Sequence, residues 1–145
     1  MLPSPVDATK PPAPALERLR RATRALHDGV EATGASARIL APTVDRGSYA
    51  AFLARTLAVI APVEAWLETA CPASGEGDTA IGRRSAALRS DLAVLGWHPP
   101  VAPPDMAQAV AAALGPLPRN RGTVLGVLYV LEGSLLGGSV IARHI

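Results

Sequence analysis

Four side chains that could do chemistry recur near the start of the chain. They are Arg20, Arg24, His27 and Glu31, at steps of four, three and four residues. This spacing places them on a single stripe if the segment is an α-helix. A histidine there can offer one ring nitrogen to a metal, while a carboxylate one turn away orients the ring directly or through water. The two arginines could pair with anionic groups of the same ligand.

The same spacing is also typical of a solvated helix surface. In that interpretation His27 is an ordinary exposed residue, and the arginines and Glu31 form surface pairs that contribute little to stability. Periodicity alone does not decide between the two. We expect His98 and His144 to be structural or exposed rather than catalytic. Because Cys and His do not cluster at ligand spacing, the sequence gives little support to a zinc or di-iron site.

A second unusual segment is the apolar stretch 123–145, which carries the glycines Gly126, Gly133, Gly137 and Gly138. Each glycine inside a helix costs about 1 kcal/mol relative to alanine. We expect the close approach of another backbone or of a flat ligand to offset that cost, and tight packing of two helices explains the glycines equally well. The segment lacks the Lys and Ser or Thr of a phosphate loop and follows no strand, which argues against nucleotide binding.

The same stretch is long enough to raise the possibility of a membrane span. Glu132 argues against it, because a carboxylate near the middle of a span costs on the order of 3 kcal/mol. The sequence therefore favours a buried core helix over a membrane helix.

Helices must position these residues, since apolar side chains recur at helical spacing and no stretch alternates as a strand. We predict helices over 16–32, 49–70, 83–95, 105–114 and the apolar stretch 123–145. Pro62 should kink or interrupt the second helix. Gly96 should cap the end of the third helix, and Asp105 should be the N-cap of the fourth.

Composition fits one all-α domain. The 145 residues suffice for one core, and 49% apolar but only 3% aromatic content favours packed helices. Prolines in the first 14 residues indicate a flexible Pro/Ala-rich leader over 1–15, without export features, followed by a helical domain over 16–145. A net charge of +2 without charge runs predicts no nucleic-acid partner. Cys71 is the single cysteine, so we expect a reducing, cytoplasmic location.

Two segments together carry a family resemblance: LRRATRALHDGVE at 19–31 and LYVLEGSLLGGSVI at 128–141. They resemble the signature segments of heme oxygenases, particularly the bacterial, bacteriophytochrome-associated type. The resemblance implies that the first segment is the proximal helix and that His27 is the axial iron ligand. It also implies that Glu31 supports this ligand and that Arg20 and Arg24 lie near the heme propionates.

The second segment resembles the distal helix of that family. The resemblance implies that Gly133, Gly137 and Gly138 bring backbone against the opposite face of the heme. Many members carry an aspartate that organises distal water, and the matching position here is Ser134, which can hold water but supplies no negative charge. Family members usually continue for several more helices, whereas this sequence ends at Ile145, so we expect a heme oxygenase-like bundle without the C-terminal helices.

The resemblance also implies the activity. Heme would be both cofactor and substrate, and O2 with electrons from an external donor, such as a ferredoxin or a reductase, would convert it to biliverdin, carbon monoxide and Fe2+. A biliverdin acceptor such as a bacteriophytochrome is a further implied partner. Two alternatives stay open at this point: a heme-binding or heme-sensing protein of the same fold without turnover, and a helical interaction module.

Overall fold

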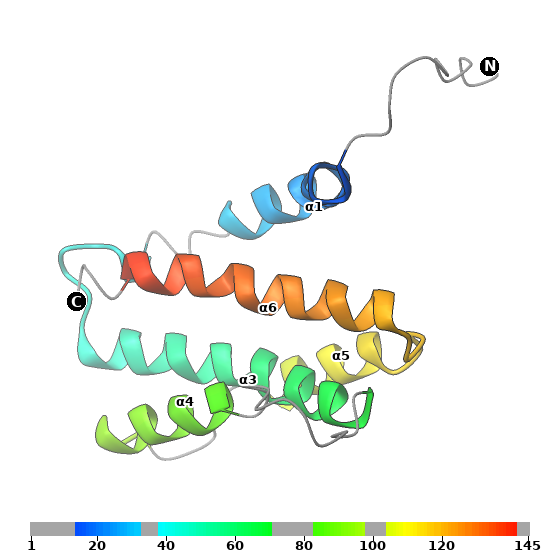
Figure 1. Ribbon diagram of the computed structural model, residues 1–145. Helices are drawn as coiled ribbons and strands as arrows, with labels where there is room; N and C mark the ends of the chain where they lie inside the picture. Colours follow the sequence, from blue (N-terminus) through cyan, green and yellow to red (C-terminus); the bar gives the residue numbers. More distant parts are fainter. Residues whose placement is uncertain (1–13, 33–37, 71–82, 98–103, 142–145) are drawn as a thin grey trace. The chain divides into compact units, whose positions relative to one another are not determined.

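The computed structural model describes residues 14–32, 38–70, 83–97 and 104–141. These residues contain no strand, and their helices are labelled in Figure 1. In chain order the helices are α1 (Ala15–Glu31), α3 (Arg46–Ala70), α4 (Arg83–Val94), α5 (Pro104–Leu114) and α6 (Arg121–Ile141). The all-α prediction is confirmed. Most of the predicted leader, together with Cys71, His98 and His144, lies outside the described residues.

The chain divides into two compact units, Met1–Ser36 and Ala37–Ile145. The first unit contains α1, and the second contains α3 to α6. The predicted boundary between a leader and a helical domain, near residue 15, stays a prediction because residues 1–13 are not described.

Helix α3 is the centre of the second unit. Helices α4, α5 and α6 all pack against it, and Figure 1 shows α3 between α4 and α6. One buried cluster joins α3 to α4 and consists of Ala50, Leu53, Ala54, Leu57 and Leu92. A second joins α3 to α6 and consists of Ile60, Trp66, Leu67, Val124 and Leu131. Burial of these side chains supplies the main driving force for assembling the unit.

Side-chain and glycine caps fix the ends of these helices. The Asp45 carboxylate accepts a hydrogen bond from the Ser48 amide at 2.6 Å, so α3 begins at Arg46, earlier than predicted. At the end of α4, Gly96 has a φ of 67°. Its amide donates to the Ala93 carbonyl, and the Trp97 amide donates to the Leu92 carbonyl, each at 2.9 Å. This is the Schellman arrangement, and it confirms Gly96 as the cap.

The predicted interruption at Pro62 and the predicted N-cap of α5 are corrected, whereas a kink at Pro62 stays a prediction. Helix α3 is not interrupted at Pro62, because Ile60 and Leu67 lie on either side of it in the same buried cluster and hold both halves of the helix. Helix α5 begins at Pro104, so Asp105 lies in its first turn rather than at the N-cap. Proline suits the first helical position because its missing amide has no partner to lose there.

Helix α6 is only partly the core helix that the sequence predicts. Val124 and Leu131 are buried, whereas Leu125 and Val130 are 55% and 64% exposed. By length and composition, among the described residues, it is α3 that could span a membrane, but half of its most apolar window is buried inside the protein. The core helix of a soluble protein has the same length and composition, so this feature is weak evidence for a membrane span.

Candidate functional site

Helix α1 carries the predicted stripe on its surface. None of its side chains is buried. The Nδ1 atom of His27 lies 3.7 Å from a carboxylate oxygen of Glu31, and the two side chains are 70% and 66% exposed. The Nε atom of Arg24 lies 3.8 Å from a carboxylate oxygen of Asp28. The helix therefore brings His27 beside Glu31, as the spacing predicts, and also pairs Arg24 with a carboxylate that the prediction left out.

In the contact between His27 and Glu31, Nδ1 is the ring nitrogen that faces the carboxylate. At 3.7 Å it is too long for a direct hydrogen bond, so orientation of the ring needs a bridging water or a small side-chain rotation. With Nδ1 turned toward Glu31, Nε2 is the ring nitrogen directed away from that carboxylate. A metal ligand arranged in this way has its tautomer and ring orientation fixed by the second nitrogen.

Asp28 belongs to the same exposed group. His27, Asp28 and Glu31 each place one potential ligand atom within 4.8 Å of the others. Because exposed side chains three and four positions apart on a helix meet in this way without any ligand, the group does not by itself define a metal centre. The pairing of Arg24 with Asp28 could have been found from the sequence by its four-residue step.

Apolar side chains lie beside the polar stripe. Leu26, directly before His27, and Val30, three positions after it, are 73% and 68% exposed. Neighbouring apolar and basic side chains on one helix surface suit a ligand that has a flat apolar face and an anionic edge.

The surroundings of Gly133 bear on the alternative explanation for the glycines in α6, which is tight packing of two helices. Among the described residues, a Cβ atom added at Gly133 would have no atom within 4 Å, and the same holds at Gly126. Close packing of α6 on the described helices of its own unit therefore does not require glycine at these two positions. Ser134, Gly137 and Gly138 lie in the helical backbone of α6, but their surroundings are outside the described structure. Because α1 and α6 belong to different units, the predicted approach of Gly133 to His27 stays a prediction.

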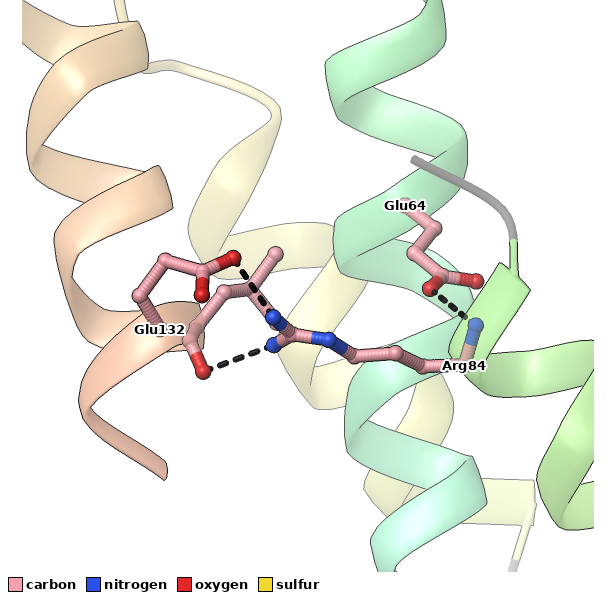
Figure 2. Close-up of polar contacts among 4 residues, drawn as sticks. Glu64, Arg84 and Glu132 are labelled. Atoms are coloured by element: carbon pink, nitrogen blue, oxygen red, sulfur yellow. Dashed lines mark hydrogen bonds and ion pairs between the residues drawn. The ribbon is translucent and has the colours of Figure 1, made fainter. Parts of the chain in front are cut away.

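A polar network in the second unit was missed by the sequence analysis. Figure 2 shows the Arg84 guanidinium, from the start of α4, pointing to α6, where it donates to the Leu131 carbonyl at 2.7 Å and to the Glu132 carboxylate at 2.6 Å. The Glu64 carboxylate on α3 accepts the backbone amides of Arg84 and Ser85 at 3.1 and 3.2 Å. Glu64 is only 3% exposed. The network links three helices at the residue that precedes Gly133.

The sequence does contain a signal for this network. Glu64 and Glu132 lie in apolar stretches, and neither has a basic residue three or four positions away. A carboxylate in such a place needs a partner from another element, because a helix surface offers it no local pair. That reasoning predicts that partners exist, but it does not single out Arg84 among the arginines.

Comparison with known proteins shows the family of the chain. The heme oxygenase family profile matches residues 13–145. A protein named heme oxygenase from Xanthomonas campestris pv. campestris (strain 8004) is 38% identical over 104 residues, which cover 69% of this chain and 54% of the relative. The matched region thus spans about half the length of that curated relative. No solved structure matches. The match over nearly the whole sequence shows that the chain belongs to the heme oxygenase family.

Proposed function

We propose that the chain is a heme oxygenase that binds heme through His27 and cleaves it oxidatively. The products would be biliverdin, carbon monoxide and Fe2+, formed with O2 and electrons from an external donor. Family membership supports the reaction class. The observation that carries the assignment of the ligand is the exposed His27 ring with its Nδ1 atom 3.7 Å from Glu31.

The residues of α1 fit heme by the chemistry of their donor groups. Nε2 of His27 is the candidate iron ligand, since Nδ1 faces the carboxylate of Glu31. Leu26 offers exposed apolar surface to the porphyrin. Arg20 and Arg24 are exposed on the same stripe and would pair with the propionates. The present partner of Arg24 is an exposed pair at 3.8 Å, which costs little to exchange for a propionate.

Helix α6 would supply the opposite wall. Among the described residues, no atom fills the space where a side chain at Gly133 would stand, and Gly137 follows four residues later on the same side of the helix. Gly138 extends this stretch without side chains. The Ser134 hydroxyl can both donate and accept a hydrogen bond, so it would hold a water beside the wall. When bound, heme would supply the iron at which O2 reacts. The glycines would place no bulky side chain over that iron and so would leave room for O2.

Partners and location follow from the same proposal. The electron donor would be a ferredoxin or a reductase, and a bacteriophytochrome would be a suitable acceptor of biliverdin. Both exchanges are expected in the cytoplasm, as the single cysteine of the sequence indicates.

Heme titration of the wild-type chain beside His27→Ala tests the proposal. We expect a sharp heme absorption band in the wild type, and its loss or a clear shift in His27→Ala. His144→Ala is the matched control, because it also removes one histidine, and its spectrum should equal that of the wild type. An unchanged spectrum of His27→Ala would overturn the ligand assignment.

Turnover separates the enzyme from a heme-binding or heme-sensing protein. The wild-type complex is given a chemical reductant under O2, with catalase present so that free peroxide cannot degrade heme. Appearance of biliverdin absorbance together with released Fe2+ supports the oxygenase. A stable heme complex without biliverdin would overturn the enzymatic proposal and favour the sensor. Absence of any heme band would leave only the helical interaction module.

A further inference from the structure

We infer that Arg84 is a positioning residue for the glycine segment of α6. Its guanidinium joins α4 to the two residues that immediately precede Gly133. The catalytic consequence of this role rests on the proposed function, whereas the structural part concerns the second unit alone and can be tested without heme.

The guanidinium holds two different groups of α6. One terminal nitrogen donates to the backbone carbonyl of Leu131, and the other donates to the side chain of Glu132. Because the guanidinium is planar, these two bonds fix the direction of the side chain as well as its distance from α6. The Arg84 side chain is 20% exposed and that of Glu132 is 63% exposed, so the bond to the Leu131 carbonyl is better shielded from water than the bond to the Glu132 carboxylate.

The other end of Arg84 is fixed to α3. Both oxygens of the buried Glu64 carboxylate accept amides from the first turn of α4, those of Arg84 and Ser85. A carboxylate is favourable at this end of a helix, while a basic side chain there is unfavourable. Arg84 is therefore a poor choice for local helix stability, and its long-range contact with α6 accounts for its presence.

Two contacts on different sides of α6 restrain its rotation. The Leu131 side chain is 7% exposed and lies in the cluster with α3, and Glu132 is tied to Arg84. Successive residues of a helix are turned by about 100°, so Gly133 lies about 200° from Leu131. The network thus keeps the backbone of Gly133 on the side of α6 opposite its packed face, where the ligand wall would have to be.

The first test measures hydrogen exchange of α6 in the heme-free protein. Removing Arg84 with Arg84→Gln should make the α6 amides near Gly133 exchange on the order of tenfold faster, since a hydrogen-bonded charge is lost. Arg89→Gln is the matched control: this arginine is also on α4, but it donates to Ser85 within its own helix at 3.0 Å. Equal exchange of α6 in Arg84→Gln and Arg89→Gln would overturn the inference.

A second variant covers the case in which Arg84→Gln fails to fold. Glu132→Gln removes the charged acceptor at a side chain that is 63% exposed, so the core is untouched. It should accelerate the same α6 amides, by a smaller factor because the Leu131 carbonyl still accepts from Arg84. Unchanged exchange in this variant would also contradict the role given to the pair.

Rescue and turnover then test the positioning role itself. Arg84→Lys keeps the charge but cannot hold two groups in a fixed plane, so its α6 exchange should fall between wild type and Arg84→Gln. Under the proposed function, Arg84→Gln should keep the His27-dependent heme band and lose turnover on the order of tenfold, whereas Arg89→Gln should lose little. Faster α6 exchange with undiminished turnover would overturn the positioning role. If the wild type binds no heme, the proposed function fails, and the exchange data still decide the structural part.

Discussion

Helix α1 and helix α3 have opposite relations between sequence pattern and burial. Helix α1 has the clearer amphipathic pattern, yet none of its 17 residues is buried. Helix α3 has apolar residues on most sides and buries nine of its 25 residues. A helix as short as α1 is marginal in water unless its apolar face is covered. The comparison indicates that the second unit is held together by its own core, whereas the described residues of the first unit give α1 no such core.

The largest expected effect comes from a pair of leucines, one from each helix. Leu67 of α3 is fully buried, and Leu26 of α1 is 73% exposed. Leu67→Ala should lower the free energy of unfolding by about 3 kcal/mol because it leaves a cavity. Leu26→Ala should change it by less than about 0.5 kcal/mol in the heme-free protein. Urea unfolding followed by circular dichroism measures both, and similar losses in the two variants would show that α1 is also part of the folded core.

Under the proposed function, heme should change α1 more than any other described helix. A ligand present at about 100 times its dissociation constant stabilises the state that binds it by about 2.7 kcal/mol. Amides of α1 should therefore exchange quickly in the heme-free protein and be protected by heme, with much smaller changes in α3. His27→Ala is the control and should remove the protection. Equal protection of α1 and α3 would mean that heme stabilises the whole chain rather than its ligand helix.

Replacing a glycine by alanine should have opposite effects on stability in the two units. Gly96→Ala places a side chain at a φ of 67° and should cost about 1 kcal/mol of stability. Gly29→Ala lies inside α1 with open space around the new Cβ, so it should raise the helix content by removing the glycine penalty of up to about 1 kcal/mol. Circular dichroism and urea unfolding check both changes. The contrast fails if both variants lose stability.

The sequence predicts most of the fold, because helical spacing and the Gly96 cap are local signals. It also predicts the meeting of His27 and Glu31, which needs only one helical turn. It does not predict that Arg84 reaches Glu132, since that contact joins residues 48 positions apart and depends on how α4 and α6 pack on α3. Pro62 shows the same limit, because buried contacts on both sides override a local helix breaker.

The smallest expected effect concerns the N-cap of α3 and its dependence on pH. Hydrogen bonds from the backbone and side chain of Ser48 lower the pKa of Asp45 below its ordinary value of 3.8. The folded state therefore favours the carboxylate of Asp45. The contribution of this cap to stability is present above the ordinary pKa and is lost as the pH falls through the lowered pKa of the folded state.

Asp45→Asn keeps an N-cap but cannot titrate. The difference in urea midpoint between the wild type and this variant should stay constant from pH 7 to about pH 5. At pH values below about 4, the midpoint of the wild type should decrease relative to that of the variant. Since all other carboxylates are common to both proteins, a constant difference down to pH 2 would show that the cap does not depend on the charge of Asp45. At the start of α1 no side chain forms a cap hydrogen bond. We therefore expect a pH-dependent cap at the start of α3 and not at the start of α1.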